Sequence, residues 1–223
     1  MLTQCPNPNC KHVFDFPDEL AGKNGPCPQC GQVITLRSLE IIRAIERQHQ
    51  QRKDQPPRLP GSAAGKPDRF SALLEDLRSL WNVGSIFRSA DGAGFGALYL
   101  CGITGCPPHK SIAKTSLGAE EHVAWSHHSN ALDILQDLRA QKVQIIALEK
   151  TENSVLLSEA LTKKLIHPPL CLIVGNEVAG VSAQALSRAD LVCHLPMHGV
   201  KTSLNAAVAF GIAAYALRES SEV

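Results

Sequence analysis

The chain alternates short apolar runs with segments of helical periodicity over most of its length, and this alternation limits the folds open to it more than any other feature. The apolar runs that predict buried strands are residues 97–101, 143–148, 170–174 and 191–197. The segments that predict helices or helical turns are residues 70–80, 82–90, 130–141, 161–165, 184–188 and 205–217. Strands that alternate with helices form a mostly parallel sheet covered on both faces, so the sequence predicts an α/β fold.

Three of the predicted elements adjoin polar, glycine-containing turns. Residues 82–96 lead into strand 97–101, residues 175–182 follow strand 170–174, and residues 198–202 follow strand 191–197. Ser203 stands where the N-cap of the alanine-rich helix 205–217 belongs, and the small residues of that helix allow another element or a second subunit to approach closely. One such turn is ordinary α/β construction, but three of the same kind predict a shared ligand site.

These turns resemble the three signature motifs of the SpoU/TrmH family of RNA 2′-O-ribose methyltransferases, within the SPOUT superfamily. The residues that match the three motifs in order are Asn82 and Arg88, then Gly175, Asn176 and Glu177, then Leu195, Pro196, Met197, Ser203, Leu204 and Asn205. The resemblance covers about residues 70–218, and three ordered motifs are far more specific than one. It implies a SPOUT-type α/β knot, in which the carboxyl-terminal part of the sheet is tied into a trefoil.

The resemblance also implies an activity, which is methyl transfer from S-adenosylmethionine (AdoMet) to a ribose 2′-hydroxyl of tRNA or rRNA by a homodimer. Similar proteins hold the cofactor largely through backbone groups, which carries over to Gly175, Leu195, Met197, Leu204 and Leu148. The catalytic residues implied by the motifs are Arg88, Asn82, Glu177, Ser203 and Asn205.

Two roles are open for Arg88. The ribose hydroxyl must lose its proton as it attacks the methyl group, and the family pattern gives the role of base to this arginine. Neutralising a guanidinium at pH 7 costs about 7 kcal/mol, because the pKa of arginine lies above 12. Arg88 therefore acts either as the base or as a charged clamp on the adjoining phosphate, whose oxygen then accepts the proton. An ordinary surface arginine in an ion pair is the competing interpretation.

Two other interpretations of the same region are less well supported by its residues. Residues 92–97 satisfy the dinucleotide-binding pattern G-x-G-x-x-A, but they follow a predicted helix and open a predicted strand, which is the reverse of the order that a dinucleotide site requires. We interpret them as a helix-to-strand turn. The other alternative is a zinc-ribbon module that binds RNA or protein on a catalytically silent knot domain, and the intact motif residues argue against it.

The first 36 residues carry a cysteine pattern of their own. Cys5, Cys10, Cys27 and Cys30 form a C-x4-C and a C-x2-C pair, and four thiolates complete a tetrahedral structural zinc site. A segment this short cannot bury enough apolar area to fold without a bound metal ion. We therefore expect a zinc ribbon over residues 1–36; a redox-active C-x2-C pair would need a thioredoxin-like context that is missing. The other four cysteines lie in or beside apolar runs and are expected to be buried and unpaired: Cys101, Cys106, Cys171 and Cys193.

Residues 37–69 are expected to form a short amphipathic helix, over 37–50, and a linker rich in Pro and Gly. This segment has eight Lys or Arg against four Asp or Glu, so it is either a solvated spacer or an arm that grips phosphate. Residues 70–223 are then the methyltransferase domain. Within it, the long polar connection 106–125 offers Lys110 and Lys114 as RNA-binding residues, with a solvated loop as the alternative.

Length and composition limit the class of protein to which the chain can belong. A chain of 223 residues with 44% hydrophobic content can form one large domain or a medium domain with an appendage. The net charge of +1 gives no global basic field, so RNA must be met by a local patch. The longest apolar stretch, residues 206–217, is too short to span a bilayer, and no charged-then-apolar leader opens the sequence. A cytoplasmic protein is therefore expected.

Overall fold

A seven-stranded sheet forms the centre of the chain after residue 68. The structure is a computed structural model that describes residues 1–7, 9–40, 42–43 and 68–221. The strands are β5 (Phe70–Glu75), β6 (Ala97–Cys101), β7 (Ala124–His128), β8 (Gln144–Leu148), β9 (Val155–Leu156), β10 (Leu170–Val174) and β11 (Leu191–His194). Their order is β7-β6-β5-β10-β8-β11-β9, and every neighbouring pair is parallel. The predicted α/β class is confirmed.

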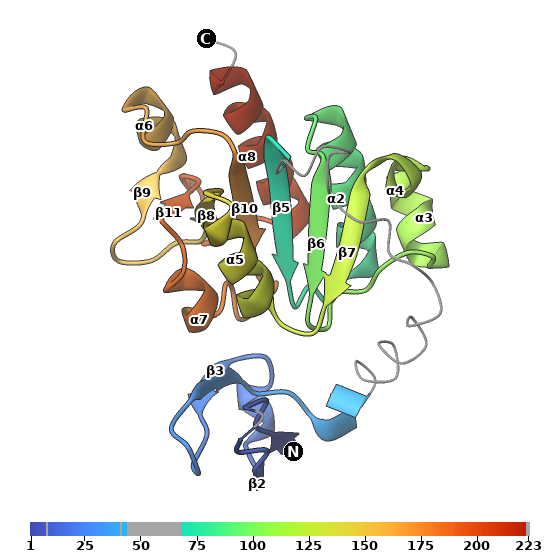
Figure 1. Cartoon of the computed structure of the whole chain (residues 1–223), viewed down its shortest axis with the longest axis vertical. Helices are drawn as coiled ribbons and strands as arrows, with labels where there is room; N and C mark the ends of the chain where they lie inside the picture. Colours follow the sequence, from blue (N-terminus) through green and yellow to red (C-terminus); the bar gives the residue numbers. More distant parts are fainter. Residues whose placement is uncertain (8, 41, 44–67, 222–223) are drawn as a thin grey trace.

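Helices cover both faces of this sheet (Figure 1). One face carries α2 (Leu80–Gly92), α3 (Lys110–Ser116), α4 (Ala119–His122), α6 (Leu157–Thr162) and α8 (Ala206–Ser220), and the other carries α5 (Ala131–Ala140) and α7 (Ala183–Leu186). Alternate side chains of β5 point to opposite faces, so that Ala72 and Leu74 join the core under α2 and α8 while Leu73 joins the core under α5. Each fully buried leucine stabilises the fold by about 1.5–3 kcal/mol.

The prediction of a helix over residues 70–80 is wrong, because residues 70–75 form the central strand β5. All six of its residues are buried. A strand that is buried on both faces is a continuous apolar run, and over so few residues its leucines also fit helical spacing. The helix begins only at Leu80, where the N-cap Ser79 accepts a hydrogen bond from the backbone N–H of Asn82 at 3.2 Å.

Smaller corrections concern helix ends and one connection. The N-cap of α8 is Asn205 and not Ser203: its Oδ1 accepts hydrogen bonds from the backbone N–H groups of Ala207 (2.9 Å) and Val208 (3.3 Å). The polar connection 106–125 is not an open loop, because it forms α3 and α4. Of the helical turn expected at 161–165, only residues 161–162 are in a helix, where they form the end of α6, which begins at Leu157. The four later cysteines are buried, as predicted.

The last crossover of the sheet is the segment that the resemblance expects to be knotted. Strand β11 lies beyond β8, whereas the helix that follows it, α8, packs against α2 near the middle of the sheet (Figure 1). The chain therefore returns across two strands between residues 194 and 206. This return brings the third motif next to the second, at the carboxyl end of β10.

The amino-terminal 36 residues form a separate small unit of two antiparallel hairpins. β1 (Leu2–Gln4) pairs with β2 (Val13–Asp15), and β3 (Asn24–Pro26) pairs with β4 (Val33–Thr35), with a single-turn η1 (Asp18–Leu20) between the hairpins. Its own core consists of Cys5, Phe16, Cys27, Ile34 and Leu36. Most of the predicted helix 37–50 and linker 51–69 lies outside the described residues.

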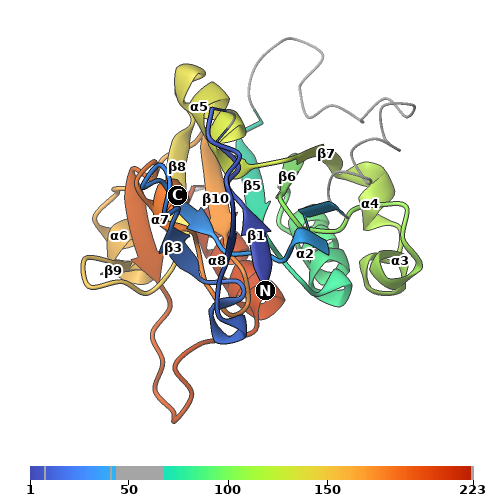
Figure 2. The same cartoon turned by 90° about the horizontal axis from the view of Figure 1, so that it is seen from below.

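This unit lies against the carboxyl end of the sheet, below β5 and β10 (Figures 1 and 2). Arg37 forms an ion pair with Asp76, the residue that follows β5, and the Gln184 side chain donates a hydrogen bond to the Val33 carbonyl. Over the residues that are described, no helix is long and apolar enough to cross a membrane.

Candidate active site

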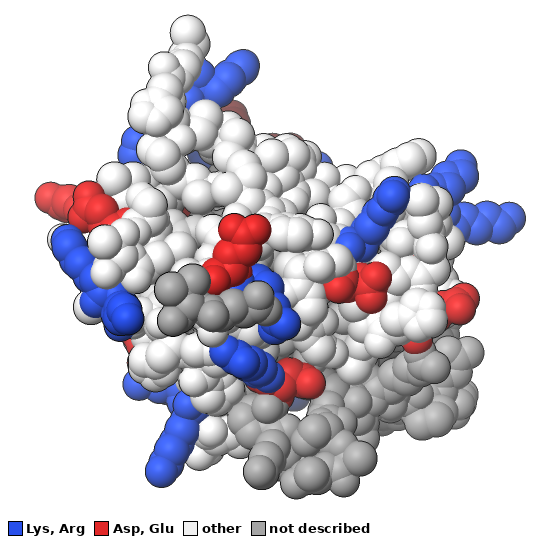
Figure 3. Space-filling model, turned by 90° about the horizontal axis from the view of Figure 1, so that it is seen from above, with Lys and Arg blue, Asp and Glu red and all other residues white. Residues whose placement is uncertain are grey.

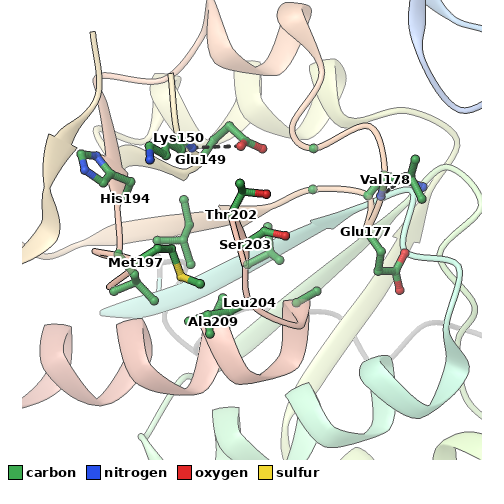
Figure 4. Close-up of a pocket in the computed structure, with 17 residues that line it drawn as sticks. Glu149, Lys150, Glu177, Val178, His194, Met197, Thr202, Ser203, Leu204 and Ala209 are labelled. Carbon is green, nitrogen blue, oxygen red and sulfur yellow. Dashed lines mark hydrogen bonds between the residues drawn. The ribbon is translucent and has the colours of Figure 1, made fainter. Parts of the chain in front are cut away.

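One cavity lies where the second and third motifs meet at the carboxyl end of β8 and β10 (Figure 4). It is lined by all five residues that were expected to bind the cofactor: Leu148, Gly175, Leu195, Met197 and Leu204. Two of the expected catalytic residues, Glu177 and Ser203, also line it. Segments that are distant in sequence are thus brought to one place by the return of the chain after β11.

The wall formed by residues 175–180 is a tight turn built on Asn176. The backbones of Asn176 and Gly180 exchange two hydrogen bonds, and the Asn176 Oδ1 accepts from the N–H groups of Val178 and Ala179, both at 2.9 Å. The Asn176 Nδ2 donates to the carbonyl of Asp76 at 2.7 Å. Gly175 is required because a Cβ there would lie 2.3 Å from the Gly180 carbonyl carbon.

Glu177 connects this turn to the start of α2. Its Oε2 accepts a hydrogen bond from the backbone N–H of Arg78 (2.9 Å), and its Oε1 accepts from the backbone N–H of Ser79 (3.0 Å) and from the Asn82 Nδ2 (2.9 Å). The Asn82 Oδ1 in turn accepts from the Asn205 Nδ2 at 3.0 Å. One residue from each of the three motifs therefore belongs to a single hydrogen-bond network.

The charge of Glu177 is fixed by these donors. Partial burial acts to raise the pKa of its carboxyl group, but the N–H groups of Arg78 and Ser79 and the Asn82 amide outweigh it and lower that pKa below the ordinary 4.5. Glu177 is therefore an anion at neutral pH, and its lone pairs are largely engaged by donors. It orients neighbouring groups and is poorly suited to accept a proton.

Arg88 lies outside this network. It is exposed, and within the described part of the chain no hydrogen bond or ion pair of its side chain is found. Six residues correspond to a rotation of about 120° around a helix axis, so Arg88 does not share the face of α2 on which Asn82 lies. Lys110 and Lys114 are exposed at opposite ends of α3.

Several lining residues were missed from the sequence. Glu149 braces the Gly175 turn, since its Oε2 accepts a hydrogen bond from the Val181 N–H at 2.9 Å. Lys150 and His194 lie at the end of the cavity opposite Glu177 (Figure 4), and the His194 Nδ1 is 3.0 Å from the Ser154 Oγ. Glu149 and Lys150 could have been found, because they directly follow a predicted strand whose carboxyl end faces the site.

The four amino-terminal cysteines form a cluster whose geometry fits zinc. Their Sγ atoms all lie within 4.8 Å of one another, with distances of 3.7 Å between Cys5 and Cys30 and 3.8 Å between Cys10 and Cys27. Tetrahedral Zn–S bonds of 2.3 Å would place the sulfurs about 3.8 Å apart. Burial acts to raise the pKa of Cys27, but the backbone N–H groups of Cys30 and Gln29 help to lower it, whereas burial raises the pKa of Cys5, so binding of a metal would be coupled to the release of protons from the cluster. The cluster would hold a structural metal with no open position.

The SpoU rRNA Methylase family matches residues 69–215, more than half of the chain. The chain belongs to this family. Curated relatives include the tRNA (guanosine(18)-2'-O)-methyltransferase of Escherichia coli (strain K12), which is 28% identical over 153 residues, or 69% of this chain and 64% of that protein. Another is the 23S rRNA (guanosine(2553)-2'-O)-methyltransferase RlmP of Bacillus subtilis (strain 168), 30% identical over 146 residues, which are 66% of this chain and 56% of that protein.

Solved structures show the same fold. The AdoMet-bound rRNA methyltransferase from Sinorhizobium meliloti superposes with a TM-score of 0.64 and 27% identity, over 74% of this chain and 60% of that chain. The chain spans less than two-thirds of the length of the curated relatives named above. Residues 92–97 link α2 to β6, so the helix-to-strand interpretation of the glycine-rich segment is confirmed and the dinucleotide pattern was a coincidence.

Proposed function

We propose that the chain transfers the methyl group of AdoMet to a ribose 2′-hydroxyl of tRNA or rRNA. The observation that carries the proposal is the single cavity lined by the second and third motifs, with the network of Glu177, Asn82 and Asn205 at one end. Membership of the SpoU family and relatives named as tRNA and rRNA 2′-O-methyltransferases support it. A silent knot domain is disfavoured, because the motif side chains are present and hydrogen-bonded to one another.

AdoMet would occupy this cavity, where it would supply the electrophilic methyl group. The lining combines apolar side chains, such as Leu148, Leu195 and Met197, with the backbone of Gly175, which suits a flat adenine bounded by a few donors and acceptors. Glu177, Asn82 and Asn205 would then orient the groups around the reacting hydroxyl, and Ser203 would contribute a hydroxyl at the cavity wall.

The proposal includes a homodimer, because one chain does not bring Arg88 to the cavity. An apolar stripe is exposed on α8, at Val208 (51% exposed), Ile212 (49%) and Tyr215 (47%), which share one face of the helix. A Cβ added at Gly92 would lie 2.6 Å from the Tyr215 hydroxyl, so Tyr215 lies against α2 at Gly92. Arg88 lies one helical turn before Gly92 and therefore borders this stripe. Ala209 of the same helix lines the cavity. A second subunit packed on the stripe would therefore meet both Arg88 and the rim of the cavity.

A pair of glycine variants tests the placement of the cofactor. Gly175→Ala puts a Cβ 2.3 Å from backbone atoms of the turn and should abolish AdoMet binding in calorimetry together with methyl transfer to bulk tRNA and rRNA. Gly199→Ala is the matched control, because no other atom lies within 4 Å of its added Cβ. Equal AdoMet affinity in the two variants would contradict the proposed position of the cofactor. If the unmodified protein binds AdoMet but does not methylate RNA, the proposed activity is wrong.

A further inference from the structure

Trp81 is a large aromatic side chain left in solvent at the start of α2. It is 54% exposed, although its neighbours Asn82 and Val83 are buried. The second tryptophan of the chain, Trp125, is half-buried against the core. Tryptophan is enriched at interfaces, because its apolar ring and its polar N–H can both find partners there.

The position of Trp81 is fixed by the packing of α2 against α3. The Thr115 Oγ1 donates a hydrogen bond to the Trp81 carbonyl at 3.1 Å. The two helices are in such close contact that a Cβ on Gly84 would lie 2.4 Å from the Ile112 carbonyl oxygen. The Lys114 Nζ lies 5.8 Å from the centroid of a Trp81 ring, within the range of a cation–π interaction. An aromatic surface and a cation are therefore held together on a rigid base.

This pair lies next to the network proposed to orient the ribose. Trp81 directly precedes Asn82, whose side chain bonds to Glu177 and Asn205. The net charge of +1 gives no global basic field, and on the face opposite the zinc-binding unit Lys and Arg are scattered, several of them beside Asp or Glu (Figure 3). Local contacts must therefore supply the affinity for RNA.

We propose that Trp81 is a stacking platform for an unpaired base of the RNA substrate close to the target nucleotide, with Lys114 contacting a phosphate beside it. This inference rests on the proposed function. An exposed indole stacks on any base, because every base has a π-face, while a lysine next to it neutralises the backbone. The platform gives affinity for single-stranded RNA without reading its sequence.

The test uses tryptophan fluorescence. In a Trp125→Phe background Trp81 is the only tryptophan, and titration with a short oligoadenylate or with bulk tRNA should quench its emission as the base stacks. Trp81→Leu should weaken RNA binding about 5- to 140-fold, whereas Trp81→Phe should keep most of it. The AdoMet affinity should be unchanged in both, because Trp81 does not line the cofactor cavity.

Three results would overturn the inference. Normal RNA affinity in Trp81→Leu would show that the indole does not contact RNA. Dissociation of a dimer by Trp81→Leu, measured by sedimentation, would assign the residue to a subunit interface. If the unmodified protein binds AdoMet but no tRNA or rRNA, the proposed RNA substrate fails together with the platform; the first two results leave that substrate standing.

Discussion

Asn176 tests most directly whether the second-motif turn shapes the cofactor cavity. It is buried, and its side chain makes three hydrogen bonds, one to the Asp76 carbonyl and two from the N–H groups of Val178 and Ala179. Asn176→Ala removes all three and keeps the backbone. Asn176 also lines the cavity, but its side-chain oxygen and amide are engaged within the turn, so a loss of binding in the variant would report mainly on the shape of the turn.

The expected loss of free energy depends on which of the former hydrogen-bond partners of Asn176 water can reach. A hydrogen bond contributes about 1 kcal/mol net, and a buried group left without a partner costs about 1–3 kcal/mol. Val178 is exposed and Ala179 is half-buried, so their N–H groups can bond to water, whereas the Asp76 carbonyl belongs to a residue that is 3% exposed. The turn should therefore lose about 1–2 kcal/mol, and the AdoMet dissociation constant should rise about 5- to 30-fold in calorimetry.

Asn130→Ala is the matched control. The Asn130 Oδ1 accepts hydrogen bonds from the N–H groups of Leu132 and Asp133 at the start of α5, away from the cavity. Loss of this N-cap costs about 1 kcal/mol, so urea denaturation should show similar destabilisation in the two variants. Only Asn176→Ala should lose AdoMet affinity. If both variants bind AdoMet as the unmodified protein does, the turn does not shape the pocket.

Four further outcomes are expected. Purified protein should contain about one zinc ion per chain, and Cys27→Ser should lose the metal and unfold residues 1–36 while the remainder stays folded by circular dichroism and AdoMet binding; metal-free native protein would contradict this. The folded-state pKa of Glu177 is lowered, so its contribution to stability is present above the unfolded pKa and is lost as the pH falls through the folded value; the stability gap between the unmodified protein and Glu177→Gln in urea should be largest at pH 7 and shrink below about pH 4. Ile212→Arg should convert a dimer to monomers in sedimentation and reduce methyl transfer, and a monomeric unmodified protein would rule the interface out. If Arg88 is a phosphate clamp, Arg88→Lys should lose nearly as much activity as Arg88→Ala, and RNA with a methylphosphonate at that phosphate should not be methylated; substantial turnover of Arg88→Lys at raised pH would favour the base.

The sequence predicts those parts of the fold that depend on local patterns. Strands β8 and β10 follow from their apolar runs, and the cysteine cluster follows from the spacing of its four residues. Strand β5 does not, because six residues buried on both faces carry no periodicity that separates a strand from a helix. The Asn82–Asn205 hydrogen bond joins residues 123 positions apart, so only the resemblance, and no local pattern, brings them together.

The contacts between the amino-terminal unit and the sheet could not be predicted from the sequence either. Arg37 opens the segment that was expected to be an amphipathic helix, yet it pairs with Asp76. The Asp76 carbonyl accepts a hydrogen bond from the Asn176 side chain, so Asp76 contacts the amino-terminal unit through its carboxylate and the second-motif turn through its backbone. Periodicity and composition carry no information on such a docking geometry.

Activation of the ribose hydroxyl is the step for which the structure narrows the choice of proton acceptor. Glu177 is an anion, but its two oxygens already accept three hydrogen bonds, so protonating it would break a network that holds two motifs together. Arg88 is exposed, and a guanidinium carries only hydrogen-bond donors, so it offers no acceptor for the proton. Neither side chain is a good acceptor in one chain. A phosphate oxygen of the RNA, clamped by a charged Arg88, would avoid both difficulties, and this favours the proposed clamp over the base.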